Sequence, residues 1–254
     1  MDLGLDKKVA VVTGSSEGIG KAIALGLAQE GARLAICARR SDRLEATAKE
    51  IRNATGSAVF ASVVDMTQEA EIDQFVQEVI AQFGTVHIVV NNMGMATKAL
   101  FTELAREDWD HTLEGNLFSA IQCTKQCLPA MRKQKWGRVI NIAAVSGREP
   151  SPNLMASNVA KSGVISFSKT LASEVADDNI LVNCICPGRI LTPQILRLFS
   201  DEQRKSIASS QIPLNRFGEA GELANLAVFL ASERGSYITG TTIPVDGGIV
   251  RALY

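Results

Sequence analysis

The sequence lacks several features that mark whole classes of protein. No apolar run reaches the roughly 18–20 residues of a membrane-spanning helix, because Lys, Arg, Asp or Asn interrupts each one. Residues 1–8 lack the basic, apolar and cleavage regions of a signal peptide. Neither sign of charge dominates, since the sequence has 26 Lys and Arg residues and 27 Asp and Glu residues. We therefore expect a soluble, cytoplasmic protein that binds neither membranes nor nucleic acid.

Paired cysteines are also missing. The chain has five cysteines, an odd number without secretory context, and we expect them to be reduced thiols: Cys37, Cys123, Cys127, Cys184 and Cys186. Cys184 and Cys186 share one strand face, but no second ligand pair lies near them. No metal site is expected.

Short β-branched runs alternate with longer helical stretches along the 254 residues. Hydrophobic residues make up 46% and charged residues 21%, which is ordinary for a chain that buries its own core. The runs are apolar on both faces, as in a parallel sheet covered by helices. The seven strand candidates are residues 9–12, 34–37, 59–64, 86–90, 139–142, 180–185 and 237–245. We predict an α/β fold, a single doubly wound Rossmann domain over residues 1–254 with a seven-stranded parallel sheet.

Residues 189–215 do not fit the alternation of strands and helices. They follow the sixth strand candidate, at its carboxyl end. An insertion at that place is where a substrate lid would sit.

A glycine-rich segment, Thr-Gly-Ser-Ser-Glu-Gly-Ile-Gly at residues 13–20, joins the first strand to a helix. Glycines permit a tight turn, and the helix N-terminus offers free N–H groups to a pyrophosphate. The alternative is a purely structural turn. Because a strand precedes the segment and a second strand ends near residue 37, we favour dinucleotide binding.

The glycine spacing and several later motifs together resemble the classical short-chain dehydrogenase/reductase family. Those motifs are Asp65-Met66, Asn91-Asn92-Met93-Gly94, Trp109 followed by Asn116-Leu117, residues 187–192 and residues 245–248. Residues 212–218 look most like bacterial β-ketoacyl carrier-protein reductases. The resemblance implies an NADP-dependent oxidoreductase that acts on a carbonyl or alcohol, and the sequence does not name the substrate.

The glycine-rich pattern and the resemblance imply a set of cofactor-binding residues. In the family, Asp65 would hold the adenine amino group and residues 187–192 the nicotinamide amide. The full set is Gly14, Ser15, Ser16, Glu17, Gly18, Ile19, Gly20, Arg39, Asp65, Met66, Asn92, Gly94, Lys161, Pro187, Gly188, Ile190 and Thr192.

The choice between NADP and NAD depends on the end of the second strand. An acidic residue there would bind both ribose hydroxyls and repel a 2′-phosphate, but the chain has Ala38-Arg39-Arg40. Arg39 offers a planar fork to the phosphate, which favours NADP, with NAD still possible. The carboxylate of Glu17 in the glycine-rich loop would oppose the same phosphate.

At the catalytic positions the sequence departs from the family. Counting back from Lys161, the family's tyrosine position holds Ser157 and its serine position holds Ala144. Asn116, Ser157 and Lys161 remain as candidate catalytic residues, with Lys161 binding the nicotinamide ribose. Loss of a positioned general acid typically costs about 10²–10⁴ in rate. We expect weak carbonyl reduction.

Other residues offer little replacement for the missing hydroxyls. Tyr237, Tyr254, His87 and His111 are not placed at the site by sequence, and Ser146 reads as a turn former. Two alternatives therefore stay open: a non-catalytic NADP-binding protein, or a non-redox isomerase or lyase.

The resemblance also implies self-association as a homotetramer. The apolar helix face of Val164, Phe167 and Leu171 and the strand ending at Val245 are its candidate surfaces.

Overall fold

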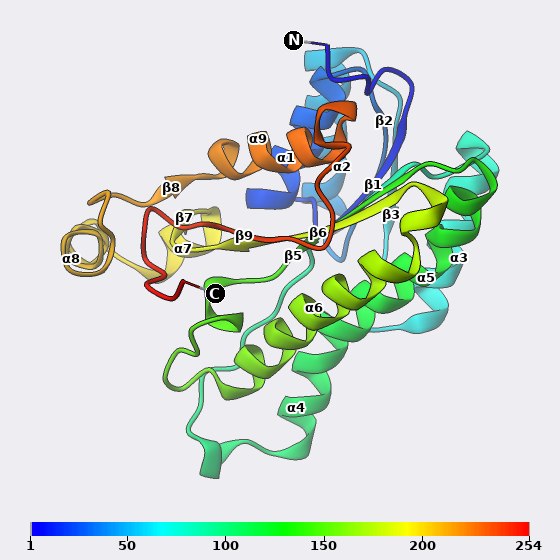
Figure 1. The fold of residues 1–254 in the computed structure, drawn as a ribbon. Coiled ribbons are helices and arrows are strands. Elements are labelled where there is room, and N and C mark those ends of the chain that lie inside the picture. Colours follow the sequence, from blue (N-terminus) through cyan, green and yellow to red (C-terminus); the bar gives the residue numbers. More distant parts are fainter. Residues whose placement is uncertain (1, 254) are drawn as a thin grey trace.

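A single sheet of seven parallel strands forms the centre of the computed structural model, which describes residues 2–253 (Figure 1). The order β3-β2-β1-β4-β5-β6-β9 reverses between β1 and β4, and this switch point is where α/β proteins bind ligands. The predicted fold class is confirmed. The strands are β1 (Val9–Thr13), β2 (Arg33–Ala38), β3 (Val59–Val63), β4 (Ile88–Asn91), β5 (Gly137–Ile142), β6 (Ile180–Pro187) and β9 (Thr242–Val245).

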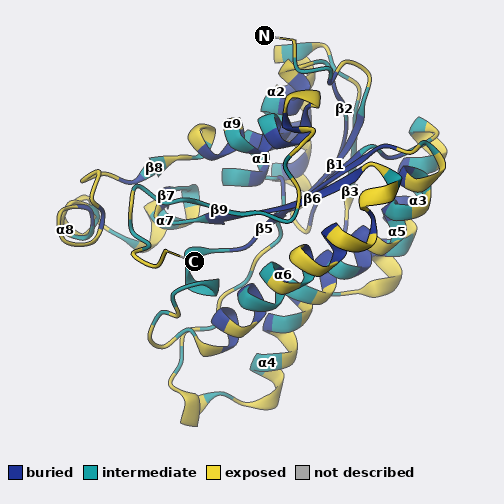
Figure 2. Cartoon of the chain, in the orientation of Figure 1, coloured by how far each residue is buried: buried dark blue, intermediate teal, exposed yellow. Residues whose placement is uncertain are grey.

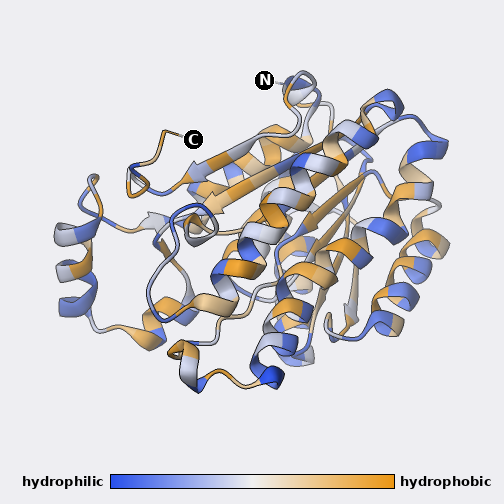
Figure 3. Cartoon of the chain, turned by 60° about the horizontal axis from the view of Figure 1, so that its bottom comes forward, coloured by the Kyte–Doolittle hydropathy of each residue, from blue (hydrophilic) through white to orange (hydrophobic). Residues whose placement is uncertain are grey.

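Helices cover both faces of this sheet. One apolar core lies under α1 (Gly18–Gln29), α2 (Ser41–Thr55) and α9 (Ala220–Ala231). The other lies under α3 (Glu69–Phe83), α5 (Ser119–Lys133) and α6 (Met155–Glu174). In Figure 2 the inner strands β1, β2, β5 and β6 are dark blue, the edge strands β3 and β9 are only partly buried, and the helices are buried on one side only. Figure 3 shows the corresponding apolar stripes of the helices. This amphipathic pattern, with strands buried on both faces, is what fixes a doubly wound sheet.

The segment after β6 builds a separate extension beyond the sheet (Figure 1). It contains β7 (Ile190–Leu191), α7 (Pro193–Leu198) and α8 (Asp201–Gln211), and β7 pairs with β8 (Gly218–Glu219). Thr192 Oγ1 and Ser200 Oγ cap the two helices by accepting from the N–H groups of Ile195 and Gln203. The extension has a small core of its own, formed by Ala208, Ile212 and Phe217.

Two sequence predictions about the surface were wrong. The last strand begins at Thr242 instead of residue 237, because a turn with Gly240 at φ +67° precedes it, and Tyr237 is fully exposed. Val164 and Leu171 are buried inside the chain, so these two residues do not form the exposed surface predicted for self-association, whereas Phe167 of the same helix is partly exposed. The exposed apolar residues of α6 are Met155 and Val159.

Between residues 2 and 253, no helix combines the length and the apolar character needed to cross a membrane.

Candidate active site

The glycine-rich loop forms an open cradle at the switch point of the sheet. Gly14 and Gly18 have φ values of +62° and +64°, which favour glycine over other residues. A Cβ at Gly20 would collide with Asn92 Nδ2 and with the Gly14 carbonyl oxygen. No side chain caps the N-terminus of α1, so its first N–H groups stay available to an anion. The loop therefore fits the pyrophosphate of a dinucleotide.

Asn92 joins the end of β4 to this loop. Its Nδ2 donates to the carbonyl oxygens of Thr13 and Gly14, both at 3.0 Å, and its backbone N–H donates to Thr13 Oγ1 at 3.0 Å. The carboxamide thus supports the cradle from beneath instead of projecting freely.

Two predicted cofactor residues have buried side chains that contact the protein itself. Ser15 is completely buried, and its hydroxyl donates to the Val12 carbonyl oxygen at 3.0 Å. Met66 is also buried, with its sulfur 3.7 Å from Cys37 Sγ.

Glu17 lies at the centre of a cluster of arginines that the sequence did not predict. Its carboxylate pairs with Arg40 at 3.1 Å, Arg43 at 2.5 Å and Arg197 at 2.7 Å. Hydrogen bonding from Arg197, followed by the other arginine contacts, lowers the pKa of Glu17 to about 2. Three guanidinium charges surround one carboxylate, so the cluster is positive despite Glu17. The expected opposition of Glu17 to a 2′-phosphate is offset.

Arg39 and Asp65 lie near each other at the same edge. Arg39 is exposed at the end of β2 and forms no ion pair within residues 2–253. Asp65 Oδ1 accepts from the N–H of Thr67 at 3.0 Å and from its hydroxyl at 2.8 Å. Burial opposes ionisation of Asp65, but the Thr67 bonds and the Arg39 charge hold its pKa below the ordinary value. Arg39 is available to a phosphate.

Lys161 and Asn116 meet at Gly94, next to the cradle. A Cβ placed on Gly94 would lie 3.3 Å from Lys161 Nζ and 3.5 Å from Asn116 Oδ1. Lys161 is only 8% exposed, and its Nζ donates to the Ile142 carbonyl oxygen at 3.1 Å. Burial lowers the pKa of Lys161 to about 8. The structure thus brings together three residues predicted from distant motifs.

Asn116 lies in a π-helical turn, Glu114–Phe118, between α4 (Arg106–Leu113) and α5. Its Nδ2 donates to the carbonyl oxygens of Met95 at 2.9 Å and Thr112 at 2.8 Å, and its Oδ1 accepts from the Met95 N–H at 3.2 Å. π-Turns are common at functional sites. Here the turn aims the carboxamide at the loop after β4.

Ser157 lies one turn before Lys161 on α6 and is also buried. Its hydroxyl donates to the Met95 carbonyl oxygen at 3.3 Å, the same oxygen that Asn116 contacts. Ala144 directly follows Ala143 at the end of β5 and carries only a methyl group. The site therefore retains an amide, an ammonium and one hydroxyl.

The segment after β6 approaches the cradle from the other side. The Gly188 N–H donates to the Val245 carbonyl oxygen at 3.0 Å. The methyl group of Thr192 would lie 3.3 Å from a Cβ at Gly18. Thr192 thus borders the glycine-rich loop, and Gly188 of the same segment packs against β9.

The other candidates lie elsewhere or do not add a reacting group. His87 Nδ1 accepts from the Val9 N–H at the amino end of β1, and burial lowers the pKa of His87 to about 4. His111 belongs to α4, and Ser146 lies in a short turn after β5. Tyr254 lies outside the described residues. All five cysteines are free, and no three potential metal ligands gather anywhere in residues 2–253.

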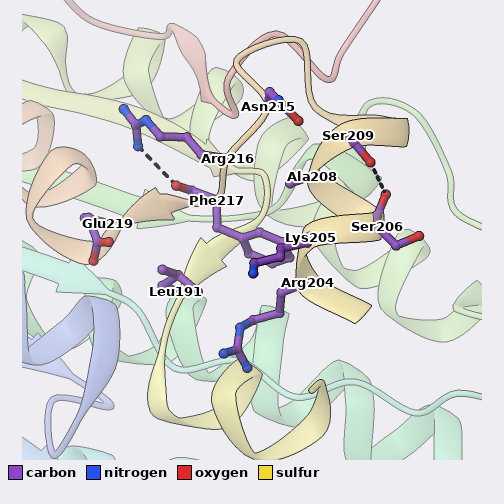
Figure 4. A pocket seen from close by; sticks show the side chains of 10 residues that line it. All are labelled: Leu191, Arg204, Lys205, Ser206, Ala208, Ser209, Asn215, Arg216, Phe217 and Glu219. Atoms are coloured by element: carbon purple, nitrogen blue, oxygen red, sulfur yellow. Dashed lines mark hydrogen bonds between the residues drawn. The ribbon is translucent and has the colours of Figure 1, made fainter. Parts of the chain in front are cut away.

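A separate cavity of about 600 Å³ lies on the extension, between α8 and the β7-β8 pair (Figure 4). Its two arginines are already paired, Arg204 with Asp201 and Arg216 with Glu222. The residues that line it are Leu191, Arg204, Lys205, Ser206, Ala208, Ser209, Asn215, Arg216, Phe217 and Glu219. It shares no residue with the site around Lys161.

Comparisons with known proteins agree with this geometry. A family model described as enoyl-(acyl carrier protein) reductase matches residues 14–250. The chain belongs to the short-chain dehydrogenase/reductase family. It is 38% identical over 243 residues to the 3-oxoacyl-(acyl-carrier-protein) reductase FabG of Staphylococcus epidermidis, covering 95% of this chain and 98% of that one. The corresponding protein of Thermotoga maritima is 37% identical over 246 residues, with 97% and 99% covered.

Solved structures give the same result. L-Sorbose reductase from Gluconobacter frateurii, complexed with NADPH and L-sorbose, matches with a TM-score of 0.97 and 39% identity over 100% of both chains. YwfH, an NADPH-dependent reductase involved in bacilysin biosynthesis, matches with a TM-score of 0.92 and 32% identity, covering 98% of this chain and 100% of that one. The predicted family and its oxidoreductase class are confirmed.

Sequence reasoning missed three parts of the site: Arg43, Arg197 and the Met95 backbone. Arg43 could have been found from its spacing of three residues after Arg40 at the start of a helix. Arg197 and Met95 carry no local signal, since only the folded chain brings them to Glu17 and Asn116.

Proposed function

We propose that this protein is an NADPH-dependent carbonyl reductase. The observation that carries the proposal is the meeting of Lys161 Nζ and Asn116 Oδ1 at Gly94, beside an open dinucleotide cradle. Both NADPH-linked relatives of known structure are named as reductases, which favours turnover over nucleotide binding alone. The non-catalytic and isomerase alternatives are therefore not favoured.

In this proposal, different residues bind different parts of the cofactor. The N-terminus of α1 holds the pyrophosphate, and Asp65 holds the adenine amino group. Arg39, with the positive cluster around Glu17, holds the 2′-phosphate. Lys161 holds the nicotinamide ribose and residues 187–192 the nicotinamide amide. When bound, NADPH supplies the hydride.

The substrate class is a ketone that NADPH can reduce, of the 3-oxoacyl kind. FabG proteins are named for 3-oxoacyl groups, and the sorbose reductase complex contains a ketose. Residues 189–215 of the single domain 1–254 act as a lid over this substrate, since they border the cradle and carry two capped helices.

The decisive experiment follows nicotinamide absorbance with purified protein, NADPH and a panel containing a 3-oxoacyl thioester, a β-ketoester and L-sorbose. Oxidation of NADPH that depends on a ketone is expected, and NADH should support it less well. Tight NADPH binding without turnover on any ketone would contradict the proposal and favour the non-catalytic alternative.

We also propose that the protein is a cytoplasmic homotetramer of 27.2 kDa subunits. Exposed apolar residues support self-association, because Phe118 of the π-turn and Met155 and Val159 of α6 lie on elements that pack together. A particle of one subunit mass in light scattering at micromolar concentration would contradict it.

A further inference from the structure

The site lacks the usual proton donor for carbonyl reduction. Carbonyl reduction needs a proton for the carbonyl oxygen, and the positions that usually carry tyrosine and serine hold Ser157 and Ala144. The groups that surround this place are the amide of Asn116 and the buried thiols of Cys184 and Cys186 on β6. Arg148, beyond β5, contributes a positive charge near Cys186. No carboxylate pairs with Lys161 within residues 2–253.

Lys161 has proton donors to spare. An ammonium carries three N–H groups, and the chain between residues 2 and 253 gives this one a single acceptor, the Ile142 carbonyl oxygen at 3.1 Å. The remaining N–H groups lie beside Gly94, in the space that also contacts Asn116 Oδ1. A buried ammonium with unused donors has a strong tendency to give or share a proton.

Ser157 lies four residues before Lys161 and so occupies the same face of α6. Its hydroxyl donates its hydrogen bond to the Met95 carbonyl oxygen. The lone pairs of the hydroxyl oxygen can therefore accept a hydrogen bond from another donor. Because serine is much shorter than tyrosine, a proton that reaches the carbonyl oxygen from this side would have to pass through an intervening water molecule.

We propose that Lys161 is the general acid of this reaction, passing its proton through one water molecule held by Ser157. This inference rests on the proposed function. As the hydride reaches the carbonyl carbon, the π electrons move to the oxygen, which takes a proton from the water. The water takes one from Lys161 Nζ, and the neutral amine regains a proton from solvent. One carbonyl, one hydride and one proton give one alcohol.

The acidity of Lys161 agrees with this role. Burial lowers its pKa to about 8, so the ammonium is populated at neutral pH and releases a proton far more readily than an exposed lysine. The nearby thiols favour the charged form, but their effect is smaller than that of burial.

The test compares Lys161→Arg with wild type and with Lys169→Arg, a matched control on the same helix whose exposed ammonium donates to the Gly240 carbonyl oxygen. Arginine keeps the positive charge but does not release a proton. We expect Lys161→Arg to lose about 10²-fold or more in kcat/KM for ketone reduction, while its Kd for NADPH stays within a few-fold. Lys169→Arg should match wild type. Wild-type kcat/KM should fall about tenfold per pH unit above the pKa of the acid.

A second measurement is independent of turnover. In protein labelled with ¹³C at lysine Cε, the signal lost in Lys161→Arg should titrate near pH 8 without cofactor. A Lys161 signal that titrates above pH 10, or a Lys161→Arg variant that keeps wild-type kcat/KM, would overturn the inference and leave the proposed function standing. A wild type that reduces no ketone would instead contradict the proposed function, and with it this role of Lys161.

Discussion

The guanidinium of Arg197 lies 2.7 Å from the carboxylate of Glu17, across 180 positions of sequence. This contact ties α7 of the extension to the glycine-rich loop. Because Arg40 and Arg43 at the start of α2 bind the same carboxylate, Glu17 gathers three arginines from two segments, the start of α2 and α7. One residue therefore couples the proposed lid to the proposed 2′-phosphate site.

Replacing Arg197 by Gln should weaken NADPH binding. The substitution removes one positive charge beside Glu17 and releases α7, and ion pairs this exposed are worth about 0.2–1 kcal/mol, so Kd should rise about 1.5–5-fold. Calorimetric titration at low and high salt measures the effect, which salt should reduce. Lys205→Gln on α8 serves as a control for loss of a surface charge. Equal Kd values for NADPH in both variants would show that the contact of Arg197 with Glu17 does not contribute to cofactor binding.

Arg39 should set the preference for NADPH. It is exposed and forms no ion pair with the rest of residues 2–253, unlike Arg40 and Arg43, so its donors are available to the 2′-phosphate. Loss of a hydrogen bond to a charged group costs about 1.5–3 kcal/mol, so Arg39→Ala should weaken NADPH binding about 10–100-fold. The Kd for NADH, which lacks the phosphate, should hardly change. Equal wild-type affinities for the two cofactors would refute this role.

The sheet could be predicted because its information is local. Runs such as Val9–Thr13 are apolar on both faces, and the glycines that follow need φ values that few other residues accept. The site could be predicted only in part. The motifs singled out Asn116 and Lys161, but the approach of both side chains to the loop at Gly94 depends on the tertiary fold.

Errors arose where exposure had to be judged from the pattern alone. Val164 and Leu171 repeat at helical spacing, which marks an apolar face without saying whether the sheet or another subunit covers it. Tyr237 looked like part of the last strand, but the turn at Gly240 separates it from β9. Contacts between distant charges, such as Glu17 with Arg197, leave no periodic signal.

A charge at Val159 should disrupt self-association. Val159 is 48% exposed on α6, and glutamate there would have to be desolvated in any apolar interface that covers it. Light scattering of Val159→Glu should give a smaller particle than wild type. Val63→Glu is a matched control, since Val63 is 55% exposed on β3, the edge strand at the opposite end of the sheet. Unchanged mass in Val159→Glu would exclude this face of α6.

The free energy of unfolding should depend on pH in a way that is specific to Lys161. Its pKa is about 8 in the folded protein, against 10.5 ordinarily, so between these values the unfolded chain binds more protons than the native one. By linkage, this group makes unfolding free energy rise with pH over that window, by up to about 1.4 kcal/mol per pH unit. Urea unfolding from pH 7.5 to 10 should therefore show a slope that Lys161→Met removes. Parallel profiles for the two proteins would show that Lys161 titrates normally.

Restoring both missing hydroxyls should raise ketone reduction. In Ser157→Tyr with Ala144→Ser, the new phenol would lie one turn from the Lys161 ammonium, which lowers its pKa, and the new serine would hold the carbonyl oxygen. The gain in kcat/KM should be on the order of 10²-fold. It should exceed the product of the two single gains, because both groups act on one oxygen. The Met95 carbonyl that Ser157 now contacts must move aside to accommodate the ring.

The measurement is kcat/KM for wild type, both single variants and the double variant on one β-ketoester with NADPH, together with the midpoint of thermal unfolding for each. If the ring is accommodated, the midpoints stay close and the double variant no longer depends on a water-borne proton. A large fall in the midpoint without a gain in rate would mean that the loop at Met95 cannot move aside. A wild type already as fast as the double variant would show that the present proton donor is as effective as a phenol, which contradicts the expected cost of losing Tyr and Ser.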